Sequence, residues 1–285
     1  MVESSTVSKR HFSVEFFPPK TSEGADKLRA TRQTLAQLEP EYFSVTFGAG
    51  GSTQSGTRDT VFDIQKEGYV AAPHISCIGR SRGDLREILA EYKTAGIRRL
   101  VALRGDLPSG YGGSSGDFSH ANELIEFIRA ETGDLFHIEA AAYPEMHPQA
   151  KSPQDDLKNF ARKVKAGANS AITQYFYNAD AYFRFVDDAQ KMGVDVPVVA
   201  GIMPITNYTQ LMRFSEMCGA DIPRWMRKRL ESFGDDRQSV QAFGVEVVTR
   251  LCQQLIDGGA TNLHFYTMNQ STLTLAILNN LNLKS

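Results

Sequence analysis

A glutamate inside an apolar segment is the most conspicuous candidate for chemistry in this sequence. Glu15 lies within the run from Val14 to Pro19, whose other members are all apolar. Burial of an unpaired carboxylate is costly and raises its pKa, so we predict that Glu15 is a proton donor near neutral pH. The alternative is an ion pair with an arginine across the protein interior, because ion-pair networks also perturb carboxylates.

A second candidate site surrounds a glycine. Arg104 and Asp106 place a cation and an anion on either side of Gly105. Glycine allows the backbone to approach a ligand closely, and a cofactor with phosphates and a polar ring would use both charges. A local Arg–Asp pair in a turn is the alternative, because such surface pairs are common.

Aromatic and imidazole groups supply a third kind of chemistry. Tyr143 and His147 follow another apolar run and could stack on a heteroaromatic ligand or hydrogen-bond to it. A loop histidine with satisfied hydrogen bonds is the alternative for His147, and a core histidine bonded to a carbonyl is the alternative for His74. Phe214 could also stack on such a ligand, and the alternative for it is packing on a helix face.

Eight predicted strands can position these side chains. Short β-branched and aromatic runs alternate with longer segments of helical periodicity, which is typical of a parallel sheet with crossover helices. The runs cover residues 11–17, 41–48, 70–77, 98–105, 137–144, 171–177, 196–204 and 262–269. Eight βα units in 285 residues predict an α/β fold, specifically a (β/α)8 TIM barrel, with extra helices at 208–259 before the last strand.

In such a barrel the active site forms at the carboxyl ends of the strands. Seven of the eight predicted strands end in polar residues, namely Glu15, Thr46, His74, Arg104 with Asp106, Tyr143, Gln174 and Tyr266. An open doubly wound sheet is the alternative. Its dinucleotide-binding motif GxGxxG is incomplete here, because Thr53 stands in place of the third glycine after Gly48 and Gly50.

Composition limits the organisation and the partners. With 41% hydrophobic residues and no low-complexity linker, residues 1–285 are predicted to form one domain, with residues 1–10 as a flexible tail. A net charge of -2 provides no field for nucleic acid or an anionic membrane, so a small molecule is the expected partner.

Cysteine spacing and hydropathy indicate the compartment. Cys77, Cys218 and Cys252 lack disulfide-framework or zinc-site spacing and are predicted to be reduced core thiols, with no metal bound. We expect a cytoplasmic protein, because the chain shows neither a signal-peptide h-region nor an apolar run long enough to span a bilayer.

Several of these segments together resemble the methylenetetrahydrofolate reductase family, in its short bacterial form. They include RGDLP at 104–108, AAYPEMHP at 141–148 and ITQYFY at 172–177, in the family's order and spacing. The resemblance covers nearly the whole chain. It implies FAD on the carboxyl-terminal face of the barrel, NADH or NADPH as hydride donor, and reduction of 5,10-methylenetetrahydrofolate to 5-methyltetrahydrofolate, which supplies methyl groups for methionine synthesis.

The resemblance also implies roles for individual residues. Glu15 would be the general acid, and the charge of Asp106 would lower the potential of the flavin. The implied FAD contacts are Thr46, His74, Arg104, Gly105, Asp106, Tyr143, His147, Asp156, Asn159, Arg162 and Lys163. The implied substrate contacts are Gln174, Gln210, Phe214, Tyr266 and Gln270. Two positions depart from the family, since Gln270 replaces an expected arginine and Phe118 an expected tyrosine.

A ping-pong reaction is expected, because one aromatic face would receive the nicotinamide and the folate in turn. The resemblance implies a homo-oligomer, specifically a tetramer. Two other functions remain open at this point. One is a TIM-barrel enzyme such as an aldolase, whose Schiff-base lysine is not apparent here, and the other is a non-catalytic flavin- or pterin-binding barrel.

Overall fold

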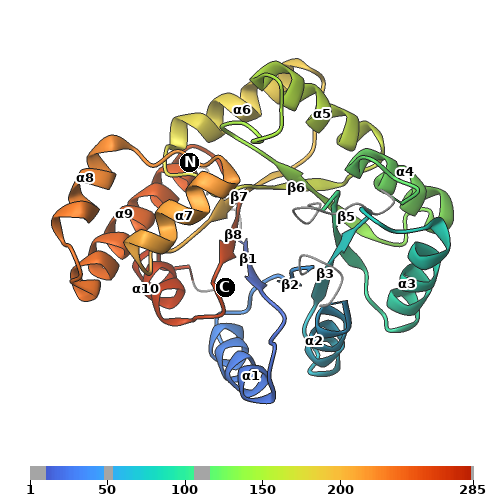
Figure 1. The fold of residues 1–285 in the computed structure, drawn as a ribbon, viewed down its shortest axis with the longest axis horizontal. Coiled ribbons are helices and arrows are strands. Elements are labelled where there is room, and N and C mark those ends of the chain that lie inside the picture. Colours follow the sequence, from blue (N-terminus) through green and yellow to red (C-terminus); the bar gives the residue numbers. More distant parts are fainter. Residues whose placement is uncertain (1–10, 48–53, 106–115, 284–285) are drawn as a thin grey trace, which may run out of the picture.

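Eight parallel strands close into a barrel at the centre of the molecule (Figure 1). The computed structural model describes residues 11–47, 54–105 and 116–283. The strands are β1 (His11–Phe16), β2 (Phe43–Val45), β3 (Ala71–Ser76), β4 (Arg99–Leu103), β5 (His137–Ala142), β6 (Ser170–Thr173), β7 (Val198–Ile202) and β8 (Asn262–Tyr266). They pair in sequence order, and β8 pairs with β1 to close the barrel, with Glu15 opposite Tyr266. The predicted fold and all eight predicted strands are therefore confirmed.

Helices surround the strands (Figure 1). They are α1 (Ser22–Ala36), α2 (Gln54–Lys66), α3 (Arg82–Thr94), α4 (Ala121–Thr132), α5 (Pro153–Lys165), α6 (Ala179–Lys191), α7 (Tyr208–Cys218), α8 (Arg224–Ser232), α9 (Arg237–Asp257) and α10 (Thr272–Asn280). Three of them, α7 to α9, stand between β7 and β8, which confirms the predicted extra helices. In the described ranges, no helix combines the length and apolar character required to cross a membrane.

Local signals in the sequence set the helix ends. At the start of α3, the Ser81 hydroxyl accepts a hydrogen bond from the Asp84 amide while the Asp84 carboxylate accepts one from the Ser81 amide. This capping box satisfies two amides that the helix itself leaves unpaired. At the other end, Gly96 has a φ of 79°, the left-handed conformation in which many helices end.

The barrel interior has an apolar side and a polar side. Val101, Ile172 and Val199 form part of a buried apolar cluster, as is usual inside such barrels. The rest of the interior is lined by buried polar groups from β1, β2, β5 and β8, including Ser13, Ser44, Glu139 and His264. Buried polar groups are costly without partners, so the contacts of these residues need an explanation.

The cysteines only partly follow the prediction of core thiols. Cys77 and Cys252 are buried, and burial raises the pKa of the Cys77 thiol to about 11. Cys218 is partly exposed and lines a cavity at the end of the barrel, so its prediction as a core thiol is wrong. It lies in the last turn of α7, whose carboxyl end reaches the barrel opening.

Candidate active site

An apolar cavity of about 340 Å³ opens at the carboxyl ends of the strands. The predicted site residues that line it are Glu15, His74, Tyr143, Gln174, Phe214 and Tyr266. They come from β1, β3, β8, the segments that follow β5 and β6, and α7. The sequence reasoning missed other wall residues, notably Phe17, Tyr175, Met203, Met217 and Met268. Aromatic and thioether side chains thus form most of a pocket that suits a flat heteroaromatic ligand.

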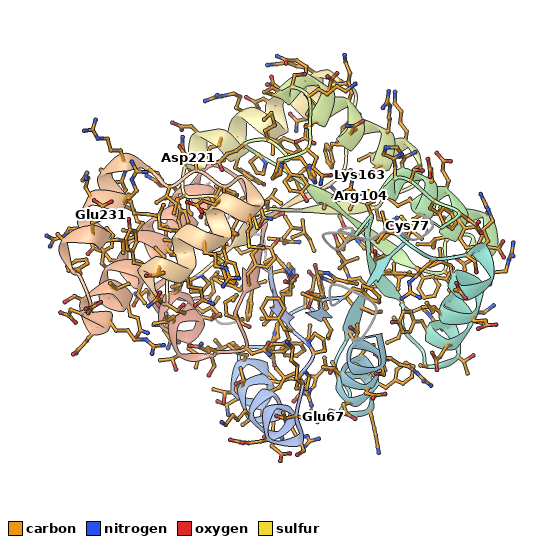
Figure 2. The ribbon with its side chains drawn as sticks, viewed as in Figure 1. Glu67, Cys77, Arg104, Lys163, Asp221 and Glu231 are labelled. Atoms are coloured by element: carbon orange, nitrogen blue, oxygen red, sulfur yellow. The ribbon has the colours of Figure 1, made fainter. Side chains whose placement is uncertain are left out.

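A polar cavity of about 320 Å³ lies next to the apolar one. The predicted residues that line it are Arg104, Gly105, Tyr143, His147, Asp156, Asn159 and Lys163. Leu103, Ala141 and Tyr143 contribute to both cavities, so the two form neighbouring parts of one site. Arg104, which follows β4, lies close to Lys163, which is part of α5 (Figure 2).

Glu15 sits on the floor of the apolar cavity, against two histidines. Its Oε2 lies 3.2 Å from Nε2 of His74 and 3.5 Å from Nε2 of His264. The His74 nitrogen is within ion-pair distance but makes no aligned hydrogen bond with a described residue. The arginine foreseen as the alternative partner of Glu15 is absent from its contacts among the described residues, and two imidazoles occupy that place.

These histidines change the protonation of Glu15. Burial raises the pKa of its carboxyl group, but the charge of His74 and the hydrogen bond with His264 outweigh burial and lower the pKa to about 2. The predicted elevated pKa of Glu15 is therefore wrong. The physical reason is that an opposite charge in a dry site favours the ionised carboxylate.

His264 is a site residue that the sequence reasoning missed. It is fully buried in β8, where Nδ1 lies 2.7 Å from the Ser13 hydroxyl. Strand alternation was the signal that could have found it, because His264 is two residues before Tyr266 and side chains two apart share one face of a strand. The two rings do meet edge to face, with centroids 5.3 Å apart.

A glycine makes room for Tyr266 in the cavity wall. The Tyr266 hydroxyl donates to the Thr173 carbonyl over 2.7 Å, and burial raises the pKa of this phenol well above its ordinary value. A Cβ atom on Gly201 would lie 2.1 Å from the same carbonyl oxygen and 2.8 Å from the tyrosine ring. Only glycine fits at this point of β7.

One face of α5 lines the polar cavity. Asp156, Asn159 and Lys163 are spaced three and four residues apart, so they lie on the same side of the helix. The Asp156 carboxylate accepts from the His147 amide over 2.8 Å, and Lys163 donates to the Ala141 carbonyl. Burial lowers the pKa of Lys163 to about 8.

Packing gives a reason for Gly105 in addition to the predicted approach to a ligand, which stays a prediction. Its φ of 88° is in the left-handed region, and a Cβ atom there would lie 2.0 Å from the Ser76 hydroxyl. Ser76 in turn donates to the Arg104 carbonyl over 2.7 Å. Packing against β3 thus requires the glycine, and the resulting turn directs Arg104 into the polar cavity, where it donates to Gln149 over 2.7 Å.

Four residues predicted to contact FAD or the substrate are not among the described residues that line the two cavities. Thr46 is half-buried after β2, and Arg162, Gln210 and Gln270 are exposed. Asp106 lies outside the described residues, so its predicted role is untested, and the roles of the other four stay predictions. Phe118 is 2% exposed and packs edge to face on Phe127 in the core.

Comparison with known proteins identifies relatives of this sequence. The family model described as "Methylenetetrahydrofolate reductase" matches residues 2–282. The "5,10-methylenetetrahydrofolate reductase" of Escherichia coli is 39% identical over 273 residues, which is 95% of this chain and 90% of the relative. The plant "Methylenetetrahydrofolate reductase (NADH) 1" of Arabidopsis thaliana is 36% identical over 285 residues, covering 95% of this chain and 48% of the relative.

A solved structure shares the fold. It is a protein from Clostridium thermocellum described as binding two copies of 5-methyl-5,6,7,8-tetrahydrofolic acid. The TM-score is 0.64 at 14% identity, and the match covers 96% of this chain and 94% of the other. At that identity the likeness supports the barrel architecture alone.

Proposed function

Because the chain belongs to the methylenetetrahydrofolate reductase family, we propose that it is an oxidoreductase that reduces 5,10-methylenetetrahydrofolate to 5-methyltetrahydrofolate. The observation that carries this proposal is the Glu15 carboxylate, placed against two imidazoles on the floor of an aromatic cavity. Such a cavity accepts a pterin ring, and such a cluster can pass a proton to a ring bound above it.

The two cavities fit FAD by the chemistry of their walls. The polar cavity offers Arg104, Asn159 and the half-buried Lys163, which suit cofactor phosphates. The apolar cavity, joined to it through Tyr143, suits the flavin ring. When bound, FAD would relay a hydride from NADH or NADPH to the folate.

Glu15 and its histidines act on the substrate nitrogen. Hydride can reach the bridging carbon of the folate only after protonation opens the five-membered ring to an iminium. The proton moves from an imidazole to Glu15 and from Glu15 to the folate nitrogen. General acid catalysis of this kind contributes about a hundred- to ten-thousandfold in rate. The carboxylate that remains then stabilises the cationic iminium beside it.

The other wall residues orient the rings. Gln174 follows β6, and its side-chain oxygen accepts from the Tyr175 amide over 3.0 Å, which leaves the amide nitrogen for the pterin. Phe214 lines the same cavity from α7 and offers an aromatic face to whichever ring is bound. Because the nicotinamide and the folate would use this one cavity in turn, the proposed reaction is ping-pong.

An absorption spectrum of the purified protein followed by anaerobic mixing tests the function. We expect bound FAD, its bleaching by NADH or NADPH, and recovery of the flavin absorbance on addition of 5,10-methylenetetrahydrofolate. Colourless protein that takes up no FAD would refute the proposal. Bound FAD that neither nicotinamide bleaches would instead favour the non-catalytic flavin-binding barrel.

A further inference from the structure

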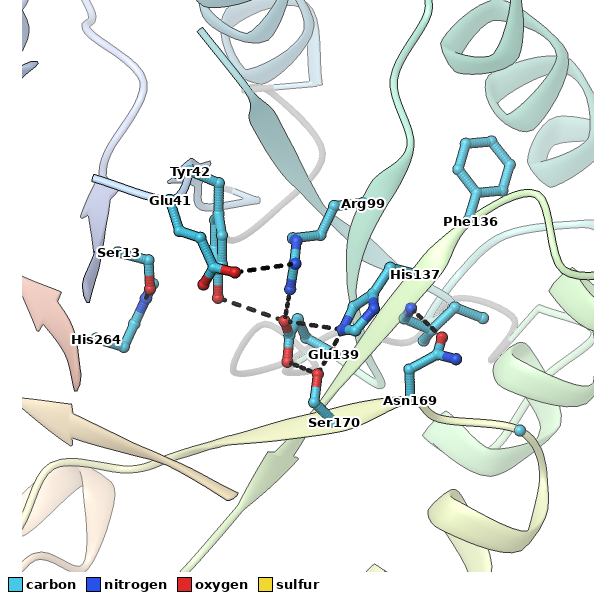
Figure 3. Close-up of polar contacts among 12 residues, drawn as sticks. Ser13, Glu41, Tyr42, Arg99, Phe136, His137, Glu139, Asn169, Ser170 and His264 are labelled. Atoms are coloured by element: carbon cyan, nitrogen blue, oxygen red, sulfur yellow. Dashed lines mark hydrogen bonds and ion pairs between the residues drawn. The ribbon is translucent and has the colours of Figure 1, made fainter. Parts of the chain in front are cut away.

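A second buried carboxylate lies near the amino-terminal ends of the barrel strands, at the end opposite the proposed substrate. Glu139 on β5 has a side chain only 1% exposed and is surrounded by Arg99, His137, Ser170 and Tyr42 (Figure 3). Its Oε1 lies 3.3 Å from Nε2 of His137 and 3.5 Å from the Tyr42 hydroxyl, and it accepts from Arg99. The function proposed above does not use this cluster.

This cluster lies at the opening of the barrel where the strands begin, here the lower opening; the upper opening is the one at the carboxyl ends of the strands. Arg99, His137 and Ser170 are the first residues of β4, β5 and β6, whereas Glu15 is the fifth of the six residues of β1. Solvent reaches the cluster, because the side chains of His137 and Arg99 are 37% and 20% exposed. Glu139 thus lies between water at the lower opening and the polar interior of the barrel.

Polar groups continue from Glu139 to Glu15. The Tyr42 hydroxyl donates to Glu139 over 3.5 Å, and the Tyr42 ring lies against His264. Ser13 lies 2.7 Å from Nδ1 of His264, and Nε2 of that ring lies 3.5 Å from Glu15. Five side chains from β1, β5, β8 and the segment before β2 therefore lie one after another through the barrel.

Stacking holds the middle of this line in place. The Tyr42 ring stacks on His264 with centroids 6.0 Å apart and 28° between the planes. The Arg99 guanidinium lies 4.4 Å from the centre of the same tyrosine ring. A tyrosine that only filled space would not need its hydroxyl directed at a buried carboxylate.

We propose that Tyr42 and Glu139 carry protons from the lower opening of the barrel to the Glu15 cluster while the substrate covers the upper opening. The proposal rests on the function proposed above, in which Glu15 gives one proton to the folate nitrogen. A bound ring blocks water from the upper side, and the Glu15 side chain is itself only 10% exposed. Replacement protons must then come through the barrel.

The transfer balances without any change in electrons. Water at the lower opening gives one proton to His137 or Glu139. The Tyr42 hydroxyl takes that proton, turns and gives its own to Ser13, and Ser13 gives its own to Nδ1 of His264. Nε2 of the same ring then gives its proton to Glu15. Tyr42 and Ser13 end as they began, and Glu15 regains the proton that it gave away. Burial raises the pKa of Glu139, but the hydrogen bond with His137 and the charge of Arg99 lower it overall, so the proton does not rest there.

Rapid mixing of reduced enzyme with 5,10-methylenetetrahydrofolate in H2O and in D2O tests the proposal. Tyr42→Phe keeps the ring and removes the hydroxyl. We expect flavin reoxidation to slow at least fivefold with a larger solvent isotope effect, while reduction by the nicotinamide is unchanged. The matched control is Tyr182→Phe, because the buried hydroxyl of Tyr182 donates to the Val198 carbonyl outside the barrel interior. Reoxidation within twofold of wild type with an unchanged isotope effect would overturn the relay.

A second measurement needs no turnover. In ¹⁵N-histidine-labelled protein saturated with 5-methyltetrahydrofolate, exchange of the His264 ring proton with water reports the path directly. We expect exchange to persist in the complex and to slow at least tenfold in Tyr42→Phe, and also in Ser13→Ala if the first variant folds poorly. Exchange that stops in wild type when the ligand binds would refute the relay. If wild-type protein instead fails to reduce the folate at all, the proposed function is wrong, and the exchange result still decides the relay.

Discussion

The side-chain amide of Asn269 pairs with both backbone groups of Phe17. Its Oδ1 accepts from the Phe17 amide over 2.8 Å, and its Nδ2 donates to the Phe17 carbonyl over 3.0 Å. The pair joins the segment after β1 to the segment after β8, at the rim where Phe17 and Met268 line the apolar cavity. One asparagine thus continues the contact between the first and last strands beyond the point where both strands end.

Replacement of Asn269 should loosen this rim. Its φ of 57° is left-handed, so Asn269→Gly keeps the backbone conformation and removes only the amide. We expect the free energy of unfolding to fall by about 0.5–1.5 kcal/mol, the net contribution of a typical hydrogen bond, and KM for the folate to rise severalfold. Denaturant unfolding and steady-state kinetics check both.

Asn279→Ala on the exposed surface of α10 is the control for this prediction. It should leave the folate KM unchanged. If Asn269→Gly alters stability but not KM, the pairing holds the barrel together without shaping the cavity.

Glu15→Gln should separate the two halves of the reaction. The amide is close in size to the carboxylate but cannot pass a proton, so folate reduction should fall by at least a thousandfold while flavin reduction by the nicotinamide stays within twofold. Anaerobic stopped-flow absorbance measures each half. Glu23→Gln, the same change at a position on α1 that is 78% exposed, should affect neither. Intact folate reduction in Glu15→Gln would show that the proton comes from elsewhere.

The lowered pKa of Glu15 also predicts a pH dependence of stability. The folded-state value of about 2 lies below the ordinary 4.5, so the ionised carboxylate stabilises the fold above about pH 4.5, and this stabilisation is lost as the pH falls toward 2. Wild type should therefore lose stability over that range more steeply than Glu15→Gln. Urea midpoints at a series of pH values measure this, and parallel curves would contradict the lowered pKa.

Strand periodicity explains why so much of the fold was predictable. The eight strands repeat as apolar runs, and barrel sites form at the carboxyl ends of strands. These two regularities are enough to bring Glu15, His74 and Tyr143 into one cavity. Asn269 could not be found in this way, because it lies beyond its strand and its partner is 252 residues away.

The lowered pKa of Glu15 could not be predicted from the sequence around it. The apolar neighbours of Glu15 along its own strand correctly indicate burial. His264, 249 residues away, reaches Glu15 only because β8 closes the barrel against β1. Local sequence therefore gives the desolvation of a group, whereas its charge partners depend on register between strands that are distant in the chain.

Gly201→Ala should displace Tyr266. The added methyl would lie 2.1 Å from the Thr173 oxygen, a distance that backbone atoms cannot accept without movement. Overpacking of this kind costs about 1–3 kcal/mol, and the shifted ring should also weaken folate binding. Gly83→Ala in the first turn of α3 is the matched control, because there the nearest atom is 3.5 Å away. It should leave stability unchanged or raise it by up to about 1 kcal/mol. Equal melting temperatures for the two variants would refute the steric argument.

The lowered pKa of Lys163 predicts that the affinity for FAD depends on pH. Burial lowers its pKa to about 8, so the side chain is cationic below that pH and loses its charge above it. An anionic phosphate prefers the cation, and affinity should therefore fall as the pH rises through 8, about tenfold between pH 7 and 9. Flavin fluorescence titrations of the apoprotein measure this. Lys163→Met should bind weakly with no such dependence, whereas Lys158→Met, 59% exposed on the same helix, should behave as wild type. A pH dependence that survives in Lys163→Met would assign the phosphate contact to a different group.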